Sequence, residues 1–240
     1  MQTTLSAHGL QRVVTTGRTG LNILRGCDLE LQGGGLTSVV GHSGSGKSSL
    51  LMCLSGLDEP TSGMVMINGR DIYRQSPGKR ANMLRSEIGF VFQQYNLVPF
   101  LTVEENIALP FQLDHKPVPH DTVRALIESF GLAHRRRASA HSLSGGEQQR
   151  TALCRALARR PGIVFADEPT GALDSQSTQT VLGTLRRMAD EGQMIVMVTH
   201  DLDAAALADK IVIMHDGHTV KHLGRSTSQE LLRIMSNLKA

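Results

Sequence analysis

A single glycine-rich segment constrains this chain more than any other feature. Residues 41–48 read GHSGSGKS, which satisfies the P-loop pattern G-x-x-x-x-G-K-[ST]. A short aliphatic run at residues 36–40 precedes the segment, and Leu50, Leu51 and Leu54 follow it at helical spacing. We therefore expect a turn between a buried strand and a helix, the context that separates a phosphate-binding loop from a chance glycine-rich turn.

The chemistry of this segment depends on its glycines and on its last residues. Glycine lets backbone N–H groups turn inward around phosphate oxygens, and the helix N-terminus adds positive potential. We expect Lys47 to reach the β- and γ-phosphates of a nucleotide and Ser48 to offer its hydroxyl to Mg²⁺. The predicted nucleotide-binding residues of the loop are Gly41, His42, Ser43, Gly44, Ser45, Gly46, Lys47, Ser48 and Ser49.

An aliphatic run that ends in two acids fits this loop. Residues 163–168 read IVFADE, and a strand buried on both faces of a parallel sheet has this continuous apolar character. Asp167 is expected to hold the Mg²⁺ shell, and Glu168 to orient or deprotonate the water that attacks the γ-phosphate. In isolation an Asp-Glu pair can be a solvated strand end, but its pairing with the P-loop favours the catalytic interpretation.

Composition limits the remaining function classes. Lys and Arg number 25 against 22 Asp and Glu, so the formal charge of +3 does not indicate a nucleic-acid partner. Three isolated cysteines, Cys27, Cys53 and Cys154, suit small buried side chains in a reducing compartment. The first residues lack a basic-then-apolar leader, and no apolar run approaches the ~20 residues of a membrane span. We predict a cytoplasmic protein whose membrane contact comes only through a partner.

The order of the patterns predicts an α/β fold with a largely parallel sheet and antiparallel strands near the N-terminus. Asn68-Gly69 after residues 64–67 signals a β-hairpin. Residues 94–160 carry helical patterns without a strand signal, which predicts an inserted helical lobe. The expected division is one domain over residues 1–240, with a RecA-like core of 1–93 and 161–240 and a helical subdomain of 94–160.

A second anion-binding element lies within this helical region. Residues 143–150 read LSGGEQQR, in which Ser144 and Glu147 form a capping box at the start of a helix. Gly145 and Gly146 remove side chains that would shield the positive helix N-terminus. This segment resembles the signature motif of the ABC ATPases residue for residue.

The resemblance implies a specific assembly. In the ABC family two protomers face each other head to tail, and each signature helix points at the γ-phosphate of the ATP held by the other protomer. It thus implies ATP and Mg²⁺ as cofactors, a second copy of this chain as partner, and Ser144, Gly145, Gly146 and Glu147 as part of the nucleotide site.

Other segments match further ABC motifs in the expected order. Gln93 resembles the glutamine that contacts Mg²⁺. The segment Gly171-Ala172-Leu173-Asp174 resembles the loop that crosses the dimer interface. His200 resembles the histidine that contacts the γ-phosphate. Taken alone, Gln93 could be an ordinary loop amide and His200 a structural histidine. Asp174 or Ser175 could simply cap a helix. The resemblance implies the metal ligands Ser48, Gln93 and Asp167 and the catalytic residues Lys47, Glu168 and His200.

One departure from the family stands out. Its members usually stack the adenine on an aromatic side chain upstream of the P-loop. The position here is Val13 or Val14, and neither side chain can stack. We expect weaker selectivity for adenine.

Residues 56–63, 92–99 and 167–174 look like the ABC ATPases of the macrolide-export and lipoprotein-release group. That likeness implies two copies of a separate permease, docked near the Gln93 loop and residues 96–105. It also implies extrusion or extraction of a lipophilic substrate such as a lipoprotein, macrolide, peptide or haem. The alternative is an ATPase of the same group that transmits force to a membrane-bound partner without transport.

The basic run at residues 134–137 is either a solvated surface or a contact for lipid headgroups or a permease acid.

Overall fold

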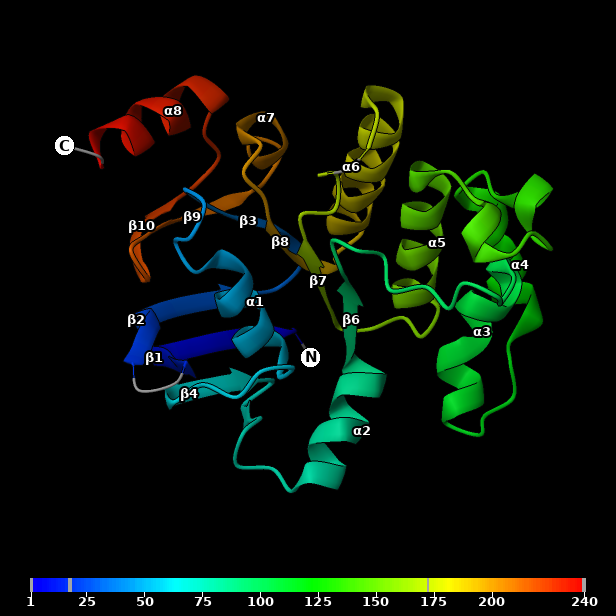
Figure 1. The fold of residues 1–240 in the computed structure, drawn as a ribbon, viewed down its shortest axis with the longest axis horizontal. Coiled ribbons are helices and arrows are strands. Elements are labelled where there is room, and N and C mark those ends of the chain that lie inside the picture. The colour runs from blue at the N-terminus through cyan, green and yellow to red at the C-terminus, as the bar shows by residue number, and fades with distance from the viewer. Residues whose placement is uncertain (1, 17–18, 172, 239–240) are drawn as a thin grey trace.

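The structure is a computed structural model that describes residues 2–16, 19–171 and 173–238 (Figure 1). Its strands are β1 Thr4–Thr16, β2 Thr19–Gln32, β3 Gly35–Gly41, β4 Ser62–Ile67, β5 Arg70–Asp71, β6 Ile88–Val91, β7 Ile163–Asp167, β8 Met194–Val198, β9 Lys210–His215 and β10 His218–Leu223. Its α-helices are α1 Lys47–Ser55, α2 Pro77–Glu87, α3 Val103–Leu113, α4 His120–Ser129, α5 Gly145–Leu157, α6 Ser175–Asp190, α7 Leu202–Ala205 and α8 Ser228–Asn237.

A six-stranded sheet forms the centre of the molecule. Its strand order is β10-β9-β3-β8-β7-β6, and every pair is parallel except the edge pair β9–β10. Strands β7 and β8 are buried along their whole length because both faces are covered. Along β7, Val164 and Ala166 pack into one core, while Ile163 and Phe165 pack into the other. The predicted parallel α/β sheet is confirmed.

The antiparallel part is a separate sheet with the order β2-β1-β4-β5. Helix α1 lies between this sheet and the central one, and its Leu50, Leu51 and Leu54 are buried there. The hairpin between β4 and β5 turns at Asn68 and Gly69, which have φ angles of 50° and 73°. Positive φ at both turn residues matches the twist of the flanking strands, so the predicted hairpin is confirmed.

Residues 94–160 contain α3, α4, α5 and two 3₁₀ turns, and no strand of either sheet runs through this fully described segment. Figure 1 shows these helices at the opposite end of the molecule from the four-stranded sheet. Helices α3 and α5 both begin with a capping box, formed by Thr102 with Glu105 and by Ser144 with Glu147. The capped starts expected from the sequence are therefore present.

The edge strand β10 is not predicted by the sequence patterns. Its HTVKHL sequence lacks the aliphatic run of the inner strands, and it pairs on one side with β9. Strand β6 ends at Val91, two residues before Gln93. Among the described helices, none combines the length and the apolar character that crossing a bilayer requires.

Asp209, which directly precedes β9, links several elements through hydrogen bonds. Its carboxylate accepts hydrogen bonds from the Leu36 backbone N–H at 2.9 Å, from Arg186 of α6 at 2.8 Å and from Arg225 at 2.6 Å. Partial burial alone would raise the pKa of Asp209, but these donors outweigh it and hold the pKa at about 2, below the ordinary 3.8. This carboxylate therefore stabilises the fold in its charged form.

We expect Asp209→Asn to lower the free energy of unfolding by about 2 kcal/mol at pH 7, because two arginines lose their charged partner. Since the folded pKa lies below the unfolded one, this contribution is present above about pH 4 and is lost as the pH falls toward 2. Urea denaturation at several pH values measures both effects. The matched control Asp190→Asn removes a more exposed partner of Arg186 and should cost less than about 0.5 kcal/mol. Equal losses for the two variants would contradict the role of Asp209.

Candidate active site

The site lies where the carboxyl ends of three parallel strands meet. Val198 at the end of β8 is in register with Val39 of β3 on one side and with Asp167 of β7 on the other. The segments that follow these strands are therefore neighbours, as is usual for ligand sites of parallel α/β sheets. They carry the glycine-rich loop, Glu168 and His200.

The backbone of the glycine-rich loop depends on the absence of side chains. Gly44 and Gly46 have φ angles of 81° and 96°, and Gly46 is the N-cap of α1. A Cβ atom at Gly41 would lie 2.5 Å from the carbonyl oxygen of Met214, so only glycine fits there. The loop leads directly into the N-terminus of α1, as the P-loop pattern predicts.

Lys47 is the first residue of α1 and is buried. Its Nζ donates to the carbonyl oxygens of Gly41 and His42, each at 2.9 Å, which places the ammonium inside the loop. Burial lowers the pKa of Lys47, and the nearby carboxylates of Glu168 and Asp167 oppose that effect only in part. A buried cation surrounded by turned-in backbone is suited to attract phosphate oxygens.

Ser48 and Asp167 face each other across the same space. The Ser48 hydroxyl donates to Oδ1 of Asp167 at 3.0 Å, and the carboxylate is buried at the end of β7. Burial raises the pKa of Asp167; the Ser48 hydrogen bond opposes this, and the nearby Glu168 charge adds to it. A hydroxyl and a carboxylate are oxygen ligands of the kind that Mg²⁺ prefers, so this pair fits the predicted metal role.

Glu168 adopts a strained backbone conformation that aims its side chain at His200. Its φ angle is 46°, its N–H donates to the Val198 carbonyl at 2.9 Å, and Nδ1 of His200 donates to its Oε1 at 2.8 Å. The other carboxylate oxygen, Oε2, is buried and has no partner among the described residues. A buried carboxylate oxygen without a partner is costly for the fold, which is typical of a functional group.

Most of these groups line one cleft of about 520 Å³. The residues around it are Leu21, Ile23, Ser43, Gly44, Gly46, Lys47, Ser48, Ser49, Gln93, Glu168 and His200. Six residues of the predicted loop thus meet Gln93, Glu168 and His200, and Asp167 joins them through Ser48. The predicted loop residues Gly41, His42 and Ser45 do not line the cleft.

Leu21 and Ile23 are the lining residues that sequence reasoning missed. They alternate along β2 and so point to one face of the hairpin; Leu21 is 64% exposed. Val14 is the cross-strand partner of Leu21, whereas Val13 pairs with Asn22. Of the two candidates, Val14 therefore lies on the cleft face. The period-two alternation of residues 21 and 23 was the available signal.

The signature residues do not belong to this cleft. Ser144 caps α5, and its backbone N–H donates to Oε2 of Glu147 at 2.9 Å. Burial alone would raise the pKa of Glu147, but hydrogen bonds from Ser144 and Arg135 outweigh it and lower the pKa to about 2. Among the residues that the structure describes, Ser144, Gly145, Gly146 and Glu147 are absent from the lining of the 520 Å³ cleft.

Helix packing is a second reason for glycine at position 146. A Cβ there would lie 2.3 Å from Oγ and 3.0 Å from Cβ of Ser177 in α6, so that side chain would have to shift. The role of Gly146 in leaving the helix N-terminus accessible stays a prediction. Asp174 caps α6 by accepting from the Ser177 N–H at 2.8 Å, which confirms its capping interpretation; Ala172 lies outside the described residues. The part of Asp174 at a dimer interface stays a prediction.

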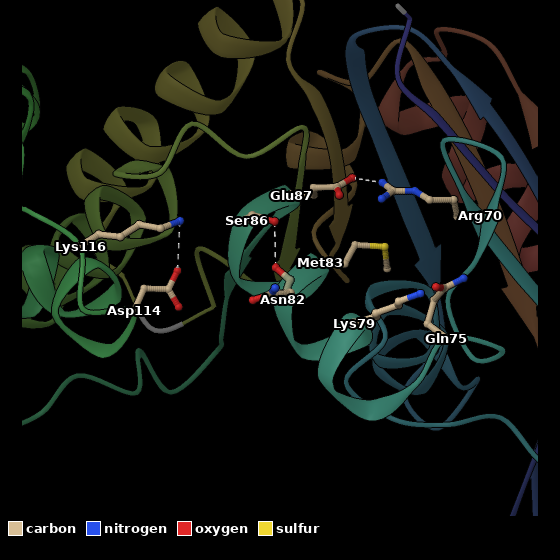
Figure 2. A pocket seen from close by; sticks show the side chains of 9 residues that line it. All are labelled: Arg70, Gln75, Lys79, Asn82, Met83, Ser86, Glu87, Asp114 and Lys116. Carbon is tan, nitrogen blue, oxygen red and sulfur yellow. Dashed lines mark hydrogen bonds and ion pairs between the residues drawn. The ribbon is translucent and has the colours of Figure 1, made fainter.

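A second cleft, of about 330 Å³, lies between α2 and the segment after α3 (Figure 2). Figure 2 shows that its acids already face cations: Glu87 is paired with Arg70, and Asp114 with Lys116. It contains no glycine-rich turn and none of the predicted site residues. The phosphate chemistry therefore belongs to the 520 Å³ cleft.

Comparisons with known proteins agree with this geometry. The family model described as ABC transporter matches residues 24–171. The lipoprotein-releasing system ATP-binding protein LolD 1 of Rhodopirellula baltica is 42% identical over 88% of this chain and 94% of its own length. The macrolide export ATP-binding/permease protein MacB of Bdellovibrio bacteriovorus is 37% identical over 87% of this chain, which spans 32% of that relative.

A solved dimeric structure of an ATP-binding cassette in a post-hydrolysis state, bound to ADP and Pi, has a TM-score of 0.86 and 31% sequence identity. It covers 92% of this chain and 99% of its own. Together with the family match, these similarities show that the chain belongs to the ABC transporter family, as one of its ATP-binding, ATP-hydrolysing cassettes.

Proposed function

We propose that two copies of this chain enclose ATP and Mg²⁺ between them and drive a separate membrane permease. The observation that carries the proposal is the separation of the two phosphate-binding elements. The P-loop and the N-terminus of α5 are both suited to bind phosphate, yet in one chain they do not share a cleft. A head-to-tail dimer would let the α5 N-terminus of one copy complete the cleft of the other.

Within each site we assign one task to each group. Lys47 binds phosphate oxygens, and Glu168 accepts the proton of the attacking water. His200 orients that carboxylate through its 2.8 Å hydrogen bond and reaches the γ-phosphate. Ser48, Asp167 and Gln93 would hold Mg²⁺, which supplies positive charge toward the phosphates. Ser144, Gly145, Gly146 and Glu147 of the second copy, with Asp174, complete the site.

An apolar groove supports the proposed permease contact. It measures about 350 Å³ and lies beside Gln93, with Phe90, Phe92, Leu109 and Leu113 among its lining residues. Arg85 and Arg159 also line it and are paired with Asp114, and Arg155 donates to the carbonyl oxygens of Tyr95 and Asn96. Phe100, in the segment expected to dock, is 78% exposed. A cytoplasmic permease segment with apolar side chains would match this surface. The groove is lined by residues of both the proposed core (1–93 and 161–240) and the proposed helical subdomain (94–160).

The substrate class is inferred from the relatives. Their names state lipoprotein release, macrolide export and, for the PvdT protein of Pseudomonas aeruginosa, pyoverdine export. We propose that this chain powers export or extraction of a lipophilic substrate. It would act at the cytoplasmic face of the membrane, in a complex of two copies with two permease subunits.

Glu168→Gln is expected to bind ATP normally, because Lys47 and the loop are intact. Loss of the general base should reduce turnover by roughly 10²–10⁴-fold. The unhydrolysed ATP should hold two chains together, which light scattering measures as a dimer that appears only with ATP. If this variant hydrolyses ATP at the parent rate, Glu168 is not the base.

Ser144→Arg and Lys47→Ala provide a complementation test of the shared site. Ser144→Arg should bind ATP as a monomer but hydrolyse it roughly 10²-fold more slowly, whereas Lys47→Ala should lose ATP binding. In a mixed dimer, the P-loop of the Ser144→Arg chain meets the intact α5 N-terminus of the Lys47→Ala chain, so one complete site forms. Mixing the inactive variants should therefore restore activity. A mixture no more active than its parts would argue against a composite site.

The aliphatic residues Val14, Leu21 and Ile23, which face the cleft, are expected to discriminate poorly between ATP and GTP. With Val14, Leu21 and Ile23 in place of an aromatic ring, ATP and GTP should bind with affinities within about threefold of each other. Val14→Tyr should tighten ATP binding about fivefold through stacking, worth about 1 kcal/mol. Competition against a fluorescent ATP analogue measures both. The control Val220→Tyr alters a valine of similar exposure on β10 and should change nothing. A strong ATP preference in the parent chain would refute the idea.

A further inference from the structure

The basic run at residues 134–137 is not a uniform solvated surface. Nε of Arg135 donates to Oε1 of Glu147 at 2.9 Å, and Nε of Arg136 donates to Oε2 of Glu104 at 2.9 Å. Their acidic partners retain only 10% and 26% side-chain exposure. Arg137 is exposed and forms no ion pair with a described residue. Two consecutive arginines therefore have specific partners, and the third offers a natural comparison.

The two acids both lie in the first turn of a helix. Glu147 is the third residue of α5 and forms its capping box, whereas Glu104 is the second residue of α3, next to the capping residue Glu105. Both carboxylates thus face a positive helix end and an arginine at once. Because Arg135 and Arg136 are adjacent in the chain, the N-termini of the two helices are linked through one short segment.

The backbone reinforces this link. The segment that follows Arg136 runs beside the segment that leads into α3. Val103 N–H donates to the Ala138 carbonyl at 3.0 Å, and Ala140 N–H donates to the Leu101 carbonyl at 2.9 Å. Further bonds join residues 104 and 136 at 3.2 Å and residues 99 and 141 at 3.1 Å, around an isolated bridge between residues 102 and 139. Residues 99–104 and 136–141 therefore form a paired ribbon.

This ribbon connects two functional regions. One strand of it, residues 99–104, includes exposed Phe100 and lies in the segment proposed to meet the permease. The other strand leads through Leu143 directly to Ser144, the N-cap of α5. The two segments are therefore joined by backbone hydrogen bonds and not only through the chain between them.

Arg135 acts on Ser144 through a single carboxylate. One oxygen of Glu147 accepts from Arg135, and the other accepts from the Ser144 backbone N–H at 2.9 Å. The Glu147 N–H in turn donates to the Ser144 hydroxyl at 3.3 Å. Fixing the carboxylate thus fixes the geometry of the helix N-terminus that would face phosphate.

We infer that Arg135 and Arg136 are positioning residues for the phosphate site at the N-terminus of α5, which they link to residues 99–104. This inference rests on the proposed function, because that site is completed only in a dimer. Neither arginine is expected to touch the nucleotide held by its own chain, since neither lines the cleft that holds the P-loop.

The test compares single substitutions along the run in the Glu168→Gln chain, with ATP-driven dimerisation followed by light scattering. Arg135→Ala should raise the protein concentration at half-dimerisation about tenfold, and Arg136→Ala about threefold. Arg135→Lys should recover part of the loss, and Arg137→Ala should match the parent. In the chain with Glu168 restored, the arginine variants should lower kcat in the same order. The affinity of the monomer for a fluorescent ATP analogue should be unchanged.

The possible outcomes distinguish a failure of the proposed function from a failure of the positioning role. If the Glu168→Gln parent does not dimerise with ATP, the proposed function fails before any arginine is compared. If the parent dimerises but Arg135→Ala and Arg136→Ala behave as Arg137→Ala does, the positioning role is overturned. A loss of monomer ATP binding together with a lower urea midpoint would assign the arginines to stability alone, which also overturns it.

Discussion

The in-register pairing of β3, β8 and β7 is the constraint on which the site depends. These strands are buried on both faces, so a shift of register would move aliphatic side chains out of both cores at once. The pairing fixes Val39, Val198 and Asp167 in one row, and the chain leaves each strand at the same edge of the sheet. The segments that leave this edge carry the phosphate loop, the metal-ligand candidates, the proposed base Glu168 and His200.

The groups at this edge are costly for the fold. Glu168 has a positive φ angle, Lys47 is a buried cation, and His42 Nε2, Ser45 Oγ and Glu168 Oε2 are buried without a partner in the described chain. Each of these features normally destabilises a protein by an amount on the order of 1–3 kcal/mol. They persist because the surrounding helix α1 and the central sheet are well packed. Lys47 and Glu168 line the same cleft, and His42 and Ser45 belong to the loop beside it, as a preorganised site requires.

The second phosphate-binding element is built on different principles. It lies at the end of a ribbon rather than at a sheet edge, and its geometry depends on paired charges: Glu147 with Arg135, and Glu104 with Arg136. Glu147 retains 10% and Glu104 26% of its side-chain exposure, so both ion pairs are partly shielded from solvent. The proposed site would therefore combine a cleft at a sheet edge with a helix N-terminus that ion pairs hold in place.

The sequence by itself determined the local features. The capping box of Ser144 and Glu147, the Asn68-Gly69 turn and the buried strand that ends at Asp167 all depend on residues close together in the chain, and each was predicted correctly. For the 520 Å³ cleft, the P-loop and Glu168 were predictable because the carboxyl ends of parallel strands must meet, whereas Gln93 and His200 were expected only from the resemblance to the ABC ATPases. The tertiary structure alone decided which valine faces the cleft, that Gly146 packs against Ser177, and that Arg135 and Arg136 have partners while Arg137 has none among the described residues. Those outcomes depend on strand register, helix packing and distant side-chain contacts. A short sequence pattern does not encode them, because their partners lie on other elements of the fold.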